Sequence, residues 1–338
     1  MNNRLCLVGV RTDCVTAHQI AQSGGFLKGF APVFLLFFAL GLFGFLLSPV
    51  RAEEMGTGIV YGDDHAFAVR APRGWVLDNR SGVPDGLQAV FYPTGSTWRD
   101  SRAVMYVNTT GKHAKGEGKS SGSTGALQAF VAADVRRFRQ ESPGVFVSDS
   151  PSLTTKDGKT ALIRTFTGDK WKNREAVAYI DEPTIVAMIV LSSRDEGTFE
   201  KCFPAFEQLV ASYEFITTKP NLEKLKELQF NWDFDARVEA AKQAELVEGA
   251  KEWVTSTGPV SQAALNYCLP PSAPPFRGNF TMVAEVLPSG TLSSVWVRPD
   301  SDVSRCFRER MKQEKLPPPP SSYGAKPYPI TFTINVVP

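Results

Sequence analysis

The chain has 338 residues, of which 43% are hydrophobic, 21% charged and 11% aromatic. This composition excludes a disordered tail, a collagen-like repeat and a polytopic membrane protein, and the length predicts about two domains. Lysine and arginine number 37 against 35 aspartates and glutamates, which gives a net charge of +2. The chain therefore lacks the basic excess of a nucleic-acid-binding protein, and we expect no nucleic-acid partner.

The first predicted element is an export signal. No charged residue occurs in residues 29–50, and Phe34–Leu47 is a dense apolar core. This core has the length of a signal-peptide apolar region and is shorter than the ~20 residues that span a bilayer. We predict a signal peptide over residues 1–52, cleaved between Ala52 and Glu53, and hence a periplasmic protein. The alternative is an uncleaved anchor in the inner membrane, and only in that case does the protein contact a membrane, through this segment.

Residues 57–217 alternate predicted strands with two predicted helices. Turn sequences at Gly62–Asp64 and Lys156–Lys159 join strands into hairpins. Apolar residues recur at helical spacing over Leu127–Phe138 and over Phe199–Val210. Hairpin-joined strands with two helices predict an α+β fold, in which helices cover an antiparallel sheet.

The remaining chain divides into a connector and a small domain. Residues 218–257 are charged and rich in alanine, which predicts a helical connector. The segment 258–338 holds 14 of the 24 prolines. Within it, a hairpin over Phe280–Arg298, a helix over Asp302–Lys312 and a strand over Tyr328–Val336 predict a compact β-β-α-β domain.

The first of these domains resembles a known family. Residues 57–216 resemble the PsbP-like α/β/α sandwich and the bacterial periplasmic proteins built on it. The residues that carry the resemblance are Phe67–Trp75, Ala89–Pro93, Asp157–Ala161, Glu175–Ile180 and Phe206–Phe215. The resemblance implies a binding or assembly module without a catalytic centre.

The last domain resembles a second family. Residues 279–337 are similar to the C-terminal domain of TonB-type energy transducers, through the hairpin Phe280–Val297, the helical pair Cys306-Phe307, and Pro329–Asn335. The extended Pro-Lys and Pro-Glu spacer of those transducers is missing from the sequence. The resemblance therefore implies a module that binds a protein partner in the cell envelope, rather than energy transduction.

Three cysteines follow the predicted signal peptide. Cys268 and Cys306 both lie in the small proline-rich domain, whose short core would gain from a cross-link, so we predict a disulfide between them. Cys202 neighbours two phenylalanines on a predicted helix and is expected to be a buried thiol. We place Trp296 and Phe332, on alternating strands, in the core.

Few residues are candidates for phosphate binding, metal binding or catalysis. The segment Gly116–Ser120 lacks the glycine spacing of a phosphate-binding loop and is expected to be a surface loop. His65 follows Asp63 and Asp64, which could form a weak metal site, although a solvated turn is the simpler interpretation. His113 lies in the same predicted loop as Gly116–Ser120. We expect no catalytic residue, no metal and no cofactor.

Together these features predict an exported, non-enzymatic periplasmic protein that binds or assembles through surface recognition of a partner or ligand. One alternative is a membrane-anchored component of a TonB-like envelope transport complex. A second alternative is an envelope enzyme with a site that the sequence does not reveal.

Overall fold

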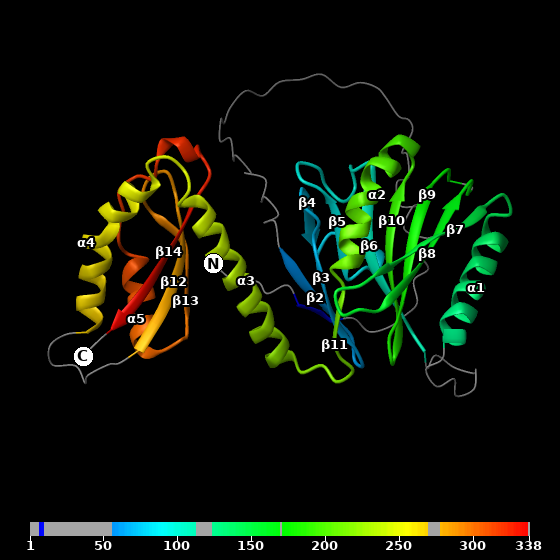
Figure 1. The fold of residues 1–338 in the computed structure, drawn as a ribbon, viewed down its shortest axis with the longest axis horizontal. Helices are drawn as coiled ribbons and strands as arrows, with labels where there is room; N and C mark the ends of the chain where they lie inside the picture. Colours follow the sequence, from blue (N-terminus) through cyan, green and yellow to red (C-terminus); the bar gives the residue numbers. More distant parts are fainter. Residues whose placement is uncertain (1–6, 10–55, 113–123, 170, 270–277, 337–338) are drawn as a thin grey trace, which may run out of the picture. The chain divides into compact units, whose positions relative to one another are not determined.

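The computed structural model describes residues 7–9, 56–112, 124–169, 171–269 and 278–336. The chain forms two compact units, which we call the N-terminal unit (Met1–Gln229) and the C-terminal unit (Phe230–Pro338) (Figure 1). The predicted cleavage site Ala52–Glu53, the apolar core of the predicted signal, and the loop that holds Gly116–Ser120 and His113 lie outside the described residues.

The N-terminal unit is built on a seven-stranded sheet with the order β4-β5-β6-β10-β9-β8-β7. Every neighbouring pair in this sheet is antiparallel. Its strands are β4 (Trp75–Asp78), β5 (Ala89–Pro93), β6 (Ala103–Gly111), β7 (Phe146–Thr154), β8 (Thr160–Thr167), β9 (Arg174–Asp181) and β10 (Ile185–Ser193). A 3-10 helix, η2 (Val83–Asp85), lies between β4 and β5.

A smaller sheet has the order β1-β2-β3-β11. Its strands are β1 (Leu7–Gly9), β2 (Thr57–Tyr61), β3 (Ala66–Arg70) and β11 (Glu214–Thr217). β2 and β3 form the hairpin that the sequence predicts, and β1 pairs with β2 in parallel.

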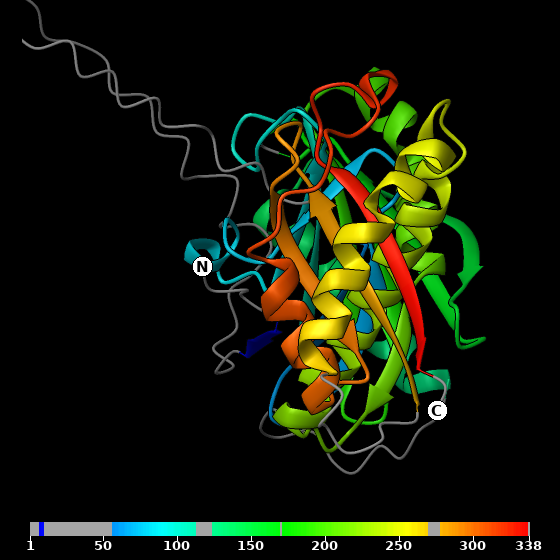
Figure 2. The same cartoon turned by 90° about the vertical axis from the view of Figure 1, so that its left-hand side faces the viewer.

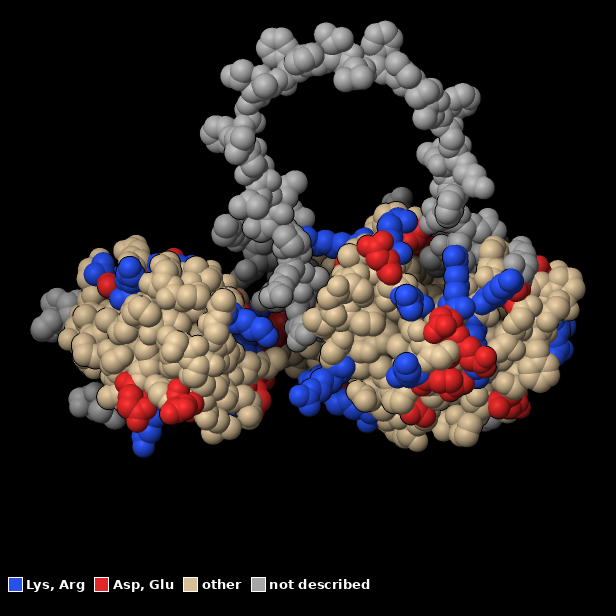
Figure 3. Space-filling view, turned by 90° about the horizontal axis from the view of Figure 1, so that it is seen from above, with Lys and Arg blue, Asp and Glu red and all other residues tan. Residues whose placement is uncertain are grey.

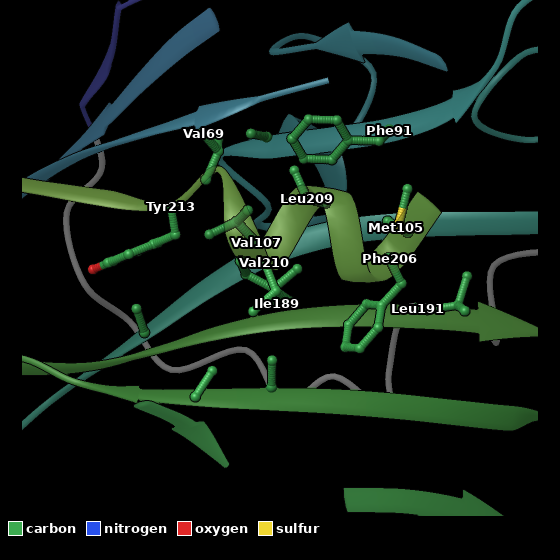
Figure 4. Packing of buried hydrophobic residues seen from close by; sticks show 14 of the residues in the cluster. Val69, Phe91, Met105, Val107, Ile189, Leu191, Phe206, Leu209, Val210 and Tyr213 are labelled. Carbon is green, nitrogen blue, oxygen red and sulfur yellow. The ribbon is translucent and has the colours of Figure 1, made fainter. Parts of the chain in front are cut away.

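Helix α2 (Glu196–Ala211) covers one face of the seven-stranded sheet. The Asp195 side chain caps its N-terminus by accepting a hydrogen bond from the Thr198 N–H at 2.6 Å. The buried side chains of α2, Phe206 and Leu209 among them, pack against apolar side chains of β5, β6 and β10 (Figure 4). Helix and sheet thus bury their apolar faces against each other.

Helix α1 (Thr124–Glu141) covers the opposite face. Leu127, Val131 and Phe138 on this helix are buried against the sheet, and the Phe138 ring stacks on Phe166 with ring centres 4.3 Å apart. Because successive residues of β9 point to opposite faces, Val177 and Tyr179 contact the α1 side. The fold is therefore α+β with an antiparallel sheet between helices, as the sequence predicts.

The C-terminal unit has a three-stranded antiparallel sheet with the order β13-β12-β14. Its strands are β12 (Gly278–Val286), β13 (Leu292–Arg298) and β14 (Tyr328–Val336), and its helices are α4 (Ala250–Cys268), α5 (Asp302–Met311) and the 3-10 helix η3 (Ser321–Tyr323). Helices α4 and α5 lie side by side over one face of this sheet (Figure 2). The turn between β12 and β13 requires Gly290, which has a φ of +84° and whose Cβ would meet the Leu316 carbonyl oxygen at 2.0 Å.

The predicted connector, residues 218–257, is not a separate linker. It forms most of α3 (Leu222–Ala244) and the start of α4, and the boundary between the units falls inside α3. Ala244, Ala250 and Trp253 belong to the core of the C-terminal unit. Small side chains allow these helices to pack closely, and the charged residues that resemble a linker occupy their outer surfaces. Within the described residues, no helix is long and apolar enough to cross a membrane.

Candidate functional site

A pocket of about 160 Å³ lies in the C-terminal unit, between α3 and the sheet face opposite α4 and α5. Alternation along the strands creates this face. Met282 and Ala284 point into the core, whereas Glu285 on β12 and Trp296 on β13 point to α3. The side chains that give the pocket its chemistry are Arg237, Glu285, Trp296, Tyr323, Pro327 and Pro329.

Arg237 on α3 is the charged group of the pocket. Its Nη1 lies 3.0 Å from Glu285 Oε1, and its guanidinium carbon lies 3.9 Å above the centre of the Trp296 ring. A planar guanidinium can stack on an aromatic ring while it binds a carboxylate in its own plane. Arg237 therefore fixes α3 to both β12 and β13, and its charge is balanced within the protein.

A second arginine fixes the same helix. Arg298 Nη2 lies 2.5 Å from Asp235 Oδ1, and the Arg298 guanidinium stacks over Phe234 at 4.5 Å from the ring centre. Phe234 is buried. Two stacked and ion-paired arginines thus hold α3 against the sheet, so that the pocket has a fixed wall.

Two residues that line the pocket carry hydrogen-bond donors without a partner. Among the described residues, the indole N–H of Trp296 and the hydroxyl of Tyr323 have no hydrogen-bond partner. The only carboxylate of the pocket, Glu285, is engaged by Arg237. The free polar groups of the pocket are therefore a ring N–H and a phenol, set between aromatic and proline side chains.

The N-terminal unit has a buried polar cluster under α1. Tyr179 Oη donates a hydrogen bond to Asp134 Oδ2 at 2.6 Å, and Arg137 pairs with the same carboxylate. Glu175 accepts a hydrogen bond from Ser192 Oγ at 2.9 Å. Burial away from water raises the pKa of the Glu175 carboxyl to about 7, and the negative charges of Asp169 and Asp134 add to the effect.

A second polar cluster lies at the turns of the same sheet. Glu182, in the β9–β10 turn, is buried and pairs with Lys159. Burial raises the pKa of the Glu182 carboxyl, although Lys159 acts in the opposite direction. Burial also raises the pKa of the Tyr213 hydroxyl, and the charge of Glu182 adds to this.

On the face of this unit seen in Figure 3, acidic and basic side chains are intermixed.

The simpler interpretation of His65, as part of a solvated turn, is wrong. It is 1% exposed, and its Nδ1 lies 3.0 Å from Asp64 Oδ1. The β2–β3 turn closes over the ring so tightly that a Cβ at Gly62 would lie 2.4 Å from it. The described residues contain no group of three histidines, cysteines or carboxylates able to hold a metal.

Cys268 and Cys306 form the disulfide that the sequence predicts. It joins the end of α4 to the middle of α5 and thus cross-links the two helices that cover the sheet. Cys202 is a free thiol, half-buried against the core of the N-terminal unit, and burial raises its pKa. A thiol with a raised pKa is largely protonated at neutral pH and is a poor nucleophile.

Sequence reasoning missed the pocket. It placed Trp296 in the core, whereas this side chain lies on the α3 side of the sheet and is partly exposed. The available signal was the alternation of β13, in which Val295 and Val297 are the core residues. Arg237 lies within the predicted connector, where nothing in the local pattern distinguishes it from its charged neighbours.

Comparisons with known proteins find structural likeness only. No protein-family model matches the chain, and no curated protein is similar to it. A PsbP of the cyanobacterium Synechocystis is 14% identical, with a TM-score of 0.31, over 48% of this chain and 94% of that one. The Ran-binding protein Mog1p of Saccharomyces cerevisiae is 13% identical, with a TM-score of 0.31, over 47% and 92% of the two chains.

A Bacteroides thetaiotaomicron protein is 12% identical, with a TM-score of 0.25, over 52% of this chain and 57% of that one. These scores carry no argument about function, and the fold class stands on the strand order and helix packing described above. The resemblance of residues 279–337 to TonB-type domains stays a prediction.

Proposed function

We propose that this protein is an exported, non-enzymatic binding or assembly protein of the cell envelope, and that its binding site is the pocket of the C-terminal unit. The observation that carries the proposal is the pair of free donors, Trp296 N–H and Tyr323 O–H, in a pocket with aromatic and proline walls. Binding sites typically combine a mostly apolar surface with a few placed polar groups. The partner is a ligand or a protein segment that offers hydrogen-bond acceptors.

The buried ionisable groups of the N-terminal unit support binding rather than catalysis. Asp134, Glu175 and Glu182 each have a hydrogen-bond or ion-pair partner inside the unit. His65 is enclosed by its own turn. A catalytic acid or base must reach a substrate, whereas these groups face other parts of the protein.

Site-specific crosslinking in cells tests the proposal. A photo-reactive amino acid is placed at position 323, at the pocket, and in a matched variant at position 267, where Tyr267 is 68% exposed on α4. We expect one adduct that forms at position 323, does not form at position 267, and disappears when the pocket is blocked by Ala240→Trp. Identical adducts at both positions, or none at position 323, would contradict the proposal.

Export rests on the apolar segment Phe34–Leu47, which also favours the membrane-anchored alternative. Intact-mass measurement of the protein from the periplasmic and the membrane fractions separates the two. A mature chain that begins at Glu53 supports a free periplasmic protein. A membrane-bound chain that retains residues 29–50 supports an anchored component of an envelope complex.

A further inference from the structure

We propose that the pocket of the C-terminal unit binds an extended, proline-rich peptide, with one proline ring inserted between Trp296, Tyr323 and Pro329. The inference rests on the proposed function, because it names the class of ligand for the same site. Three observations carry it: the balance of donors and acceptors in the pocket, the charge at its edge, and a proline run that the unit itself already holds.

The first observation is an excess of donors. Trp296 offers an N–H and Tyr323 an O–H, while the nearest carboxylate, Glu285, already accepts from Arg237. A ligand at this site should bring more acceptors than donors, because a buried donor without an acceptor costs free energy on desolvation. Proline has a backbone carbonyl and no N–H. A proline-rich segment therefore offers carbonyl acceptors to both donors and adds no backbone donor of its own.

Shape points to the same ligand. A volume of about 160 Å³ admits a single ring and leaves no room for a large cofactor. In the polyproline II helix the carbonyls point outward and make no internal hydrogen bonds. Aromatic-lined grooves bind such segments because ordering a stiff chain costs little entropy.

The second observation is the charge at the pocket. Arg237 is the only cation that lines it, and its guanidinium is held by Glu285 at 3.0 Å and by the Trp296 ring at 3.9 Å. An anionic ligand would have to displace Glu285 from Arg237 and leave that carboxylate without its partner. The pocket therefore favours a neutral segment over an acidic peptide or a phosphate.

The third observation is a proline run bound within the same unit. Trp253 Nε1 donates a hydrogen bond to the Pro317 carbonyl at 3.0 Å. Pro320, at the end of this run, has φ −53° and ψ 131°, close to polyproline II geometry. The Tyr328 ring lies between Trp253 and Tyr323, with both ring-centre distances at 4.8 Å. The same arrangement applies to Trp296 in the proposal: its indole N–H donates a hydrogen bond to a proline carbonyl, next to aromatic rings.

The test uses the full exported chain and two synthetic probes of ten residues, oligoproline and a glycine-serine peptide. Binding is measured by calorimetry and by the change in tryptophan fluorescence. We expect oligoproline to bind and the glycine-serine peptide to bind at least tenfold more weakly. Tyr323→Phe keeps the ring and removes one donor, and should weaken oligoproline binding about 2- to 10-fold. Trp296→Phe should weaken it by at least as much.

The matched control is Tyr267→Phe, which removes an exposed hydroxyl from α4 in the same unit and should leave binding unchanged. Unfolding midpoints of all variants show whether the fold is intact. Equal binding of both peptides, or oligoproline binding that is insensitive to both pocket variants, overturns the inference. If oligoproline does not bind but position 323 still gives its specific adduct in cells, the peptide class is wrong and the proposed function stands. If both experiments fail, both proposals are wrong.

Discussion

The two units achieve stability in different ways. In the N-terminal unit, both faces of the seven-stranded sheet are covered by helices and make two large hydrophobic clusters. The C-terminal unit has a three-stranded sheet with one cluster, and a disulfide joins its helices. A smaller unit buries a smaller fraction of its surface on folding, so a covalent cross-link contributes a larger share of its stability. The comparison indicates that packing dominates the first unit, and that a cross-link supplements packing in the second.

The largest expected effect tests packing in the N-terminal unit. Phe206 on α2 is fully buried among β6 and β10 side chains (Figure 4), so Phe206→Ala removes a ring and leaves a cavity. We expect a loss of about 3–5 kcal/mol in the free energy of unfolding of this unit. Urea unfolding, with hydrogen exchange to assign the transition to a unit, measures it. The control is Phe146→Ala, because Phe146 is 67% exposed and its removal should cost below about 0.5 kcal/mol. Similar losses for both variants would contradict the packing argument.

The next effect tests the cross-link. Replacing Cys268 and Cys306 together by serine opens a loop with a sequence separation of 38 residues. In the chain-entropy model the C-terminal unit should lose about 3–4 kcal/mol. Hydrogen exchange of β12 and β14 should accelerate, while that of β9 and β10 stays the same. Cys202→Ser is the matched control in the other unit. Equal acceleration in both units would show that they do not unfold separately.

A third effect depends on pH and belongs to the N-terminal unit alone. The Glu175 pKa is raised to about 7 in the fold, from 4.5 in the unfolded chain, so the folded state binds this proton more tightly. Its contribution to stability is complete below pH 4.5 and is lost as the pH rises to about 7. The loss reaches about 3 kcal/mol at pH 8.

Glu175→Gln should therefore stabilise the N-terminal unit at pH 8 and have little effect at pH 4.5. Glutamine keeps an oxygen for the Ser192 hydroxyl, so the variant changes the charge rather than the packing. Denaturant unfolding at the two pH values measures the difference, with the exposed Glu223→Gln as the control. If both variants show the same pH dependence, Glu175 is not the responsible group.

The smallest effect concerns a helix cap in the C-terminal unit. The Ser301 side chain accepts from the Ser304 N–H at 3.2 Å at the start of α5. Ser301→Ala should cost about 1 kcal/mol, and Ser301→Thr should keep most of the stability because threonine retains the hydroxyl. Thermal unfolding of the C-terminal unit measures both. If threonine is as destabilising as alanine, the hydroxyl is not the cause.

The fold class was predictable because its signals are local. The hairpin at Lys156–Lys159 forms as expected, and Gly158 in that turn has a φ of +82°. The connector was harder, since the pattern of residues 218–257 shows that helices form but not which unit they pack against. Alanines occur both in helical linkers and in packed cores, so the sequence did not show that Ala244 and Ala250 belong to the core of the C-terminal unit. The pocket was not predictable, because its walls come from α3, from β12 and β13, and from the stretch between η3 and the start of β14.

By itself, the sequence determined the features that depend on neighbouring residues: the alternation of the strands, the hairpin turns and the pairing of two cysteines within one small domain. Only the tertiary structure decided which polar groups are buried and which remain free. Glu175 has a raised pKa because strands and a helix exclude water from it. Trp296 lines the pocket because α3 places the Arg237 guanidinium over its ring. Burial and partnership depend on residues distant in the chain, and those contacts exist only after folding.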